Sequence, residues 1–147
     1  MNKRQEYIDK IVDKLQQINT ANGFSTDIGN KVSKGIIADY DYSDGTPFLF
    51  VAETIEKNVI AQSALSPPQT RVDLFFQVIC FYKREEIDPH DEGRTIIADV
   101  QKALFVPNEV IDLYYIDSQI DSESIGLQFV SVIINLKTNY LLNFCKT

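Results

Sequence analysis

A strict alternation of apolar residues through the middle of the chain constrains its fold more than any other feature. Six alternate positions are apolar: Val72, Leu74, Phe76, Val78, Cys80 and Tyr82. This period of two predicts a strand with one fully buried face. The opposite face has charged ends, at Arg71 and Lys83, and a half-apolar middle that water alone would not favour. Either a second layer of the same chain or another subunit is therefore expected to cover that middle.

A helix is predicted directly after this strand. Asp88 suits the N-cap position, and Pro89 suits the first helical position, where its missing N–H costs no hydrogen bond. The predicted helix ends before Pro107. Apolar residues recur along it at helical spacing: Ile96, Ile97, Val100, Ala103 and Leu104. We expect this stripe to pack on the buried face of the preceding strand.

The remaining sequence supplies one more helix and four further strands. The helix is expected over residues 2–19, closed by Asn22-Gly23 as a C-terminal cap. The strands are expected over about residues 31–39, 47–56, 109–117 and 127–142, with a polar turn at 121–126. Together these elements predict a single α+β domain over residues 1–147, with a mostly antiparallel sheet and two helices packed on one face.

The connection over residues 57–70 is long for a compact domain and is expected to be a strand-connecting arm. Its apolar residues include Val59, Ile60 and Leu65, which suits an arm that docks on a neighbouring subunit. A flap over the chain's own core remains an equal alternative. The last strand repeats the mixed outer face of the long central strand, so the sheet face away from the helices is available for association.

The composition excludes some classes of function but does not identify one. The net charge of −7 argues against a nucleic-acid-binding module, because such modules take their affinity from Lys and Arg at phosphates. The sequence has no signal peptide and no transmembrane run, so the chain is expected to fold in the cytoplasm. Cys80 and Cys145 lack metal or redox spacing and are expected to be unpaired.

No constellation of catalytic residues is apparent in the sequence. The single histidine, His90, lies at the predicted start of a helix, and there is no phosphate-binding loop or nucleophile elbow. The acidic stretch at 39–47 resembles a calcium loop only at its start, because Asp44 stands where the loop needs Gly and Phe50 where it needs Glu. We therefore expect no enzyme activity, no cofactor and no metal.

Taken in order, the elements resemble the tail terminator proteins of long-tailed bacteriophages. The resemblance rests on spaced small and apolar residues and element order: the first helix, Gly23-Phe24, Thr26-Asp27, Gly29, Val32, Gly35, the strand opened by Pro47, the long strand, Glu92-Gly93, residues 99–104 and Gly126-Leu127. It implies a hexameric ring that ends growth of the tail tube and joins tail to head. The implied partners are further copies, the tail tube protein and head–tail connector proteins.

The resemblance also implies where the protein acts. It would lie in the virion tail, after assembly in the host bacterial cytoplasm, with no membrane contact and with DNA passing through the ring without specific binding. Two sets of residues follow as hypotheses. The expected subunit contacts are Phe75, Ile79, Phe81, Phe129 and Ile133, together with the 57–70 arm. The expected acidic lining of the lumen is Asp39, Asp41 and Asp44, or Asp117, Asp121 and Glu123.

Two alternatives stay open at this level. The first is another neck or head-completion connector protein, which would share the ring and the absence of chemistry. The second is a monomeric ferredoxin-like module that binds a small ligand or peptide, which predicts a concave pocket.

Overall fold

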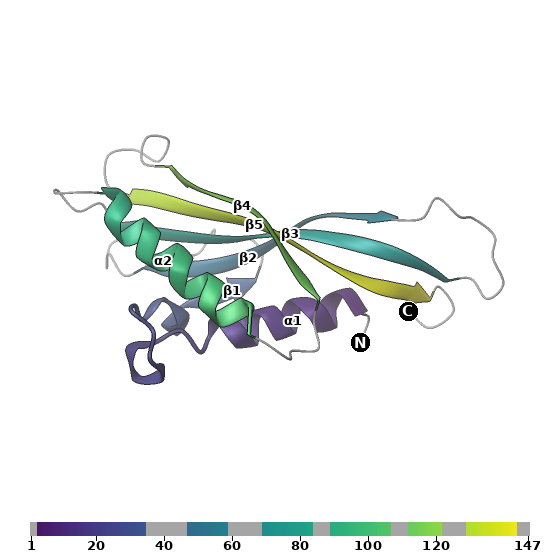
Figure 1. Ribbon diagram of the computed structural model, residues 1–147, viewed down its shortest axis with the longest axis horizontal. Helices are drawn as coiled ribbons and strands as arrows, with labels where there is room; N and C mark the ends of the chain where they lie inside the picture. The colour runs from purple at the N-terminus through teal and green to yellow at the C-terminus, as the bar shows by residue number, and fades with distance from the viewer. Residues whose placement is uncertain are drawn as a thin grey trace.

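The computed structural model describes residues 3–34, 47–58, 69–83, 89–106, 112–121 and 129–143 (Figure 1). Its elements are two α-helices, two short 3-10 helices and five strands. In chain order they are α1 (Lys3–Leu15), η1 (Thr20–Asn22), η2 (Ile28–Asn30), β1 (Val32–Lys34), β2 (Phe48–Asn58), β3 (Gln69–Lys83), α2 (Pro89–Leu104), β4 (Leu113–Asp121) and β5 (Phe129–Asn143).

The strands form one sheet in the order β1-β2-β3-β5-β4. Every neighbouring pair is antiparallel except β1 and β2, which are parallel. The two longest strands, β3 and β5, pair along fifteen residues, from Gln69 opposite Asn143 to Lys83 opposite Phe129. Both helices lie on one face of this sheet (Figure 1). The predicted α+β fold, mostly antiparallel with helices on one face, is therefore confirmed.

The core lies between the helices and the inner face of the sheet. The six alternating residues of β3, from Val72 to Tyr82, are all buried, as their period predicts. The predicted α2 stripe is buried too, with Ile97 partly so. The α1 side of the core is formed by Ile8, Ile11, Val12 and Leu15.

The C-terminal end of α1 differs from the prediction. The helix stops at Leu15, although Ile18 remains fully buried beyond it. Gly23 instead caps η1: its φ is 88° and its N–H donates to the Thr20 carbonyl at 3.1 Å. The Asn19 side chain accepts from the Asn22 N–H at 2.9 Å, and this local hydrogen bond competes with continued helix.

The segment after α1 packs tightly beneath it. A Cβ on Gly29 would lie 2.5 Å from the Leu15 carbonyl oxygen, so only glycine fits at this position of η2. The predicted strand at 31–39 appears as β1, and its residues beyond Lys34 lie outside the described residues.

The buried carboxylate of Asp99 in α2 anchors the next stretch. It accepts hydrogen bonds from the Ser25 N–H at 3.1 Å, the Thr26 N–H at 2.8 Å and Thr26 Oγ1 at 2.6 Å. Three hydrogen bonds to a carboxylate that is 4 % exposed offset the cost of its burial. They join α2 to a loop more than seventy residues earlier in the chain.

The buried stripe of helix α2 shares one core with the inner face of β3, as expected. The helix packs chiefly against β5, β4 and α1. The reason is the strand order, because the connection from β3 to β4 must carry the chain past β5, and the helix within it crosses that strand. Contact with β3 remains at Gly93, where a Cβ would lie 2.8 Å from the Tyr82 hydroxyl.

Strand β4 spans Leu113–Asp121, not 109–117. Strand β4 is an edge strand of the described sheet. Its polar residues Asp117 and Gln119 are exposed to solvent, so the strand continues through polar positions where the prediction had ended it. The connection predicted at 57–70 is also shorter, since β2 continues to Asn58 and β3 begins at Gln69. Residues 59–68 and 122–128 lie outside the described part of the chain.

Candidate association surface

The strand registers arrange the outer face of the sheet, the face away from the helices, in rows that cross β2, β3, β5 and β4. At one end are two apolar rows, which contain Phe48, Phe50, Ile79, Phe81 and Ile133. Next comes an amide row of Gln77, Asn135 and Asp117. The far end of β2, β3 and β5 is a charged end that contains Lys57, Arg71, Asp73, Lys137 and Asn139.

Three aromatic rings of the apolar rows stack on one another. The ring centres of Phe48 and Phe81 are 5.3 Å apart, and those of Phe50 and Phe81 are 5.7 Å apart. Phe48 and Phe50 are buried although both helices lie on the other face. Sequence reasoning selected Phe81 and missed its two partners. Their signal was the sequence Phe48-Leu-Phe-Val51, which is apolar on both faces of a strand.

The amide row is a chain of hydrogen bonds across three strands. Gln77 Nε2 donates to Asn135 Oδ1 at 2.9 Å, and Asn135 Nδ2 donates to Asp117 Oδ1 at 2.6 Å. Each side chain of this row forms a hydrogen bond with its neighbour. The row therefore separates the apolar rows from the charged end without burying an unpaired polar group.

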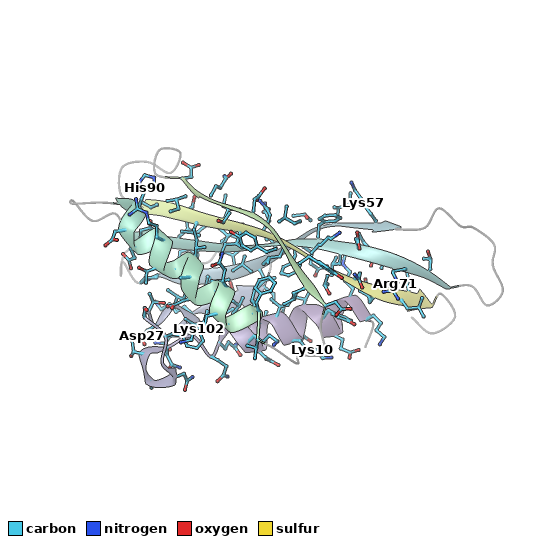
Figure 2. The ribbon with its side chains drawn as sticks, viewed as in Figure 1. Lys10, Asp27, Lys57, Arg71, His90 and Lys102 are labelled. Atoms are coloured by element: carbon cyan, nitrogen blue, oxygen red, sulfur yellow. The ribbon has the colours of Figure 1, made fainter. Side chains whose placement is uncertain are left out.

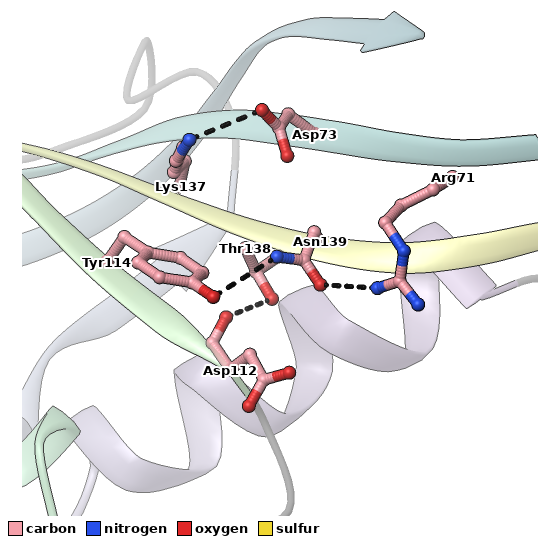
Figure 3. Close-up of polar contacts among 7 residues, drawn as sticks. All are labelled: Arg71, Asp73, Asp112, Tyr114, Lys137, Thr138 and Asn139. Carbon is pink, nitrogen blue, oxygen red and sulfur yellow. Dashed lines mark hydrogen bonds and ion pairs between the residues drawn. The ribbon is translucent and has the colours of Figure 1, made fainter. Parts of the chain in front are cut away.

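The charged end holds its side chains through contacts between strands (Figure 3). Lys137 Nζ lies 3.3 Å from Asp73 Oδ2 and 5.3 Å from the centre of the Tyr114 ring. Arg71 Nη1 donates to Asn139 Oδ1 at 3.0 Å. Lys57 lies 5.7 Å from the centre of the Phe75 ring. The ion pair is partly exposed and contributes at most about 1 kcal/mol, so these contacts orient the side chains more than they stabilise the fold.

The structure brings four of the predicted contact residues, Phe75, Ile79, Phe81 and Ile133, to this outer face, where each is partly exposed. Phe129 begins β5, and its side chain is not among those described. Asp117 lies within β4, and so does Asp121, which was predicted to begin a turn. The other predicted site residues lie outside the described residues: Val59, Ile60, Leu65, Asp39, Asp41, Asp44 and Glu123.

Sequence reasoning also missed a run of exposed apolar residues in β4. Tyr114, Tyr115 and Ile116 are 39 to 45 % exposed, on three successive positions. The register shifts between Tyr115 and Asp117, so Ile116 is an extra residue in a β-bulge. The apolar run was visible in the sequence, but its exposure follows only from the position of β4 in the sheet.

An open pocket of about 390 Å³ lies between α1 and the β1–β2 side of the sheet. Two ion pairs occupy it: Lys34 to Asp9 at 2.7 Å, and Arg4 to Glu53, whose hydrogen bond raises the pKa of the Arg4 guanidinium. A ligand would have to compete with both pairs. The pocket is lined by Arg4, Gln5, Ile8, Asp9, Lys34 and Glu53.

The residues that could carry chemistry are scattered. His90 lies in the first turn of α2 at one end of the molecule (Figure 2). Cys80 is buried, and burial together with the charge of Glu92 raises the pKa of its thiol, so the nucleophilic thiolate is disfavoured. Within the described ranges, no group of three or more His, Cys, Asp and Glu side chains is placed to bind a metal ion, and neither helix is long and apolar enough to cross a membrane.

Comparison with known proteins adds no relative. No family model matches the chain, and no curated protein matches it.

Proposed function

We propose that the chain is a structural protein of a bacteriophage or prophage tail, a tail terminator that caps the tail tube as a ring and forms the surface that joins tail to head. The order of elements, one helix, three strands, a helix and two strands, agrees with the order on which the resemblance rests. The proposal assigns the chain an assembly role and no catalysis.

One observation carries the proposal: apolar side chains on the outer face of the sheet remain partly exposed. Phe75, Ile79 and Ile133 lie on the fifteen-residue ladder of β3 and β5, opposite the face that the helices cover. Full burial of such a side chain stabilises by about 1.5–3 kcal/mol, so covering several of them supports an oligomer. The partner proposed for this face is a second copy of the chain.

The ring would contain six copies of the 16.8 kDa chain, with a mass of about 101 kDa. It would bind the tail tube protein on one side and head–tail connector proteins on the other. The acidic balance of the chain suits a channel through which DNA passes without being bound. In this proposal, either Asp39, Asp41 and Asp44 or Asp117, Asp121 and Glu123 face that channel. The protein acts in the virion tail after assembly in the bacterial cytoplasm.

The test uses purified tail tube protein assembled with and without the chain, with tube ends and lengths measured by electron microscopy. The wild-type chain should form a ring at one tube end and stop elongation. Ile79→Asp should prevent capping while retaining the fold, because it places a charge within the apolar rows. Leu141→Asp is the matched control on the same face, since Leu141 is 48 % exposed and lies outside those rows. Tubes that elongate unchanged in the presence of folded wild-type chain would refute the proposal.

The alternative functions can be distinguished from the proposed terminator function. A neck or head-completion protein would bind connector rings and leave free tube ends uncapped. The ferredoxin-like module does not fit, because that order begins with a strand whereas α1 precedes every described strand here. A small-ligand module of another kind would use the 390 Å³ pocket, and Lys34→Ala would then change ligand binding without affecting tube capping.

A further inference from the structure

Strand β4 forms one edge of the sheet, since among the described strands it pairs with β5 alone. In an antiparallel strand with one partner, every second residue turns its N–H and C=O away from that partner. Such an edge is a template for a further strand, and proteins normally protect it with Lys, Pro or a very short strand. The nine residues of β4 include neither Lys nor Pro. The opposite edge strand, β1, has three residues and ends on Lys34, so that edge is protected and β4 is not.

The β-bulge of β4 does not protect this edge, although bulges often do. Its extra residue is Ile116, so the bulge brings an exposed apolar side chain to the edge where protection would need a charge. After the bulge, β4 pairs regularly with β5, from Asp117 opposite Asn135 to Asp121 opposite Ser131. A further strand therefore has a regular stretch of backbone to pair with.

Exposed aromatic residues flank this edge on both faces of the sheet. Tyr114 stands opposite Lys137 in the ladder and lies on the outer face, with Lys137 Nζ 5.3 Å from the centre of its ring (Figure 3). Tyr115 stands opposite the buried Leu136 and lies on the helix side, where its ring packs edge-on against Phe105 at 6.3 Å. A partner on one face of the sheet would cover one tyrosine and leave the other in water. A strand added beside β4 has side chains on both faces and can cover both tyrosines.

The charge of this edge selects the partner. Asp112 precedes β4, and Asp117 and Asp121 lie within it, whereas the strand contains no Lys or Arg. The Asp112 carboxylate makes no hydrogen bond or ion pair within the described ranges, and Asp117 uses Oδ1 for Asn135. Pairing of β4 with β4 of a second copy would bring these acids together, and like charges across a strand pair are destabilising. The same acids repel the phosphates of a nucleic acid.

We propose that β4 binds an extended, basic segment of a different protein by strand addition. The segment would continue the sheet beyond β4, with its backbone hydrogen-bonded to the free edge. Its Lys or Arg side chains would lie near Asp112 and Asp117. Its apolar side chains, present on both faces, would pack on Tyr114, Tyr115 and Ile116. The contact goes beyond the proposed tail function and does not depend on it, because it uses a single copy of the chain.

The test uses three labelled peptides of about eight residues, within the usual length of a strand. The first contains Lys and Val in equal numbers, arranged so that both residue types lie on each face. The second replaces every Lys by Glu. The third keeps Lys and Val but is N-methylated at every amide, which removes the backbone donors that strand addition needs. Fluorescence anisotropy should show that the wild-type chain binds the first peptide at least about tenfold more tightly than either of the others. Amide chemical shifts of the chain should then change along β4.

Ile116→Lys places a charge at the free edge and should weaken binding of the Lys–Val peptide by at least about tenfold. Leu141→Lys is the matched control, because Leu141 is also an exposed apolar residue but lies on β5, which has a strand on each side. Thermal unfolding confirms that both variants are folded.

Three results would overturn the proposal. The first is that the Lys–Val peptide fails to bind or binds no better than its N-methylated form. The second is that Leu141→Lys weakens binding as much as Ile116→Lys. The third is self-association of the wild-type chain that Ile116→Lys abolishes, which would assign the edge to a second copy. If the peptide binds as expected but tail tubes stay uncapped, strand addition stands and the terminator function fails.

Discussion

Asp99 is a buried acid whose charge is balanced by hydrogen bonds and not by a cation. It looked like an ordinary polar position of a predicted helix, because the sequence pattern marks which residues are apolar and not which polar residues are buried. Its partners, Ser25 and Thr26, lie far away in sequence and reach it only when α2 packs beside the loop that follows α1. Such a contact is invisible to helical periodicity.

Asp99→Asn should destabilise the fold by about 1–3 kcal/mol. The two carboxylate oxygens accept hydrogen bonds from backbone N–H groups, and the introduced amide would place its own N–H donors against one of them. Chemical denaturation measures the change. Asp91→Asn, in the first turn of the same helix and exposed to solvent, is the matched control and should cost less than about 0.5 kcal/mol. Equal midpoints for the two variants would contradict the anchoring role.

Cys80 predicts a dependence of stability on alkaline pH. Burial raises the pKa of its thiol in the folded state, so the folded chain keeps the proton when the unfolded chain has lost it. Stability should therefore be unaffected below the unfolded pKa of about 8.5 and should fall above it, by at most about 1.4 kcal/mol per pH unit. Cys80→Ala removes this contribution and should flatten the decline between about pH 8.5 and pH 10.

Urea denaturation at several pH values measures that slope. The raised pKa of Tyr140, caused by burial and its hydrogen bond to Glu56, adds a decline above pH 10 that both proteins share. Parallel curves for wild type and Cys80→Ala between about pH 8.5 and pH 10 would show that the thiol is not responsible.

At the scale of elements, the long strands and α2 were predictable, and the placement of β4 was not. Alternation fixes β3 and β5 because a face made mostly of apolar residues leaves a single way to bury each strand. Strand β4 lacks that signal, since its exposed tyrosines and Asp117 show no alternation, and its predicted bounds were four residues too early. The predicted apolar stripe of α2 was correct. Which strands lie beneath the helix depends on the strand order, and no local sequence pattern contains that order.

The packing of α2 gives a prediction for two adjacent isoleucines. Ile96→Ala should destabilise by about 2–5 kcal/mol, because Ile96 is fully buried and truncation leaves a cavity. Ile97→Ala is the matched control, with the same chemistry at a partly buried position, and should cost less. Thermal or chemical unfolding measures both. A larger loss for Ile97 would mean that α2 presents a different face to the sheet.

At the scale of the whole molecule, the outer face of the sheet is the surface proposed for association of copies. The outer faces of β3 and β5 contain apolar as well as polar residues, which indicated that water alone does not cover this face. The structure brings Phe75, Ile79, Phe81 and Ile133 together on it. The proposed function requires that copies of the chain bind one another.

The most direct test of that requirement is the mass of the wild-type chain in solution, measured by light scattering after size exclusion from dilute to concentrated samples. Assembly into a ring predicts a mass that rises with concentration from 16.8 kDa toward the roughly 101 kDa of six copies, without larger aggregates. A mass that stays at 16.8 kDa across the whole range would contradict self-association.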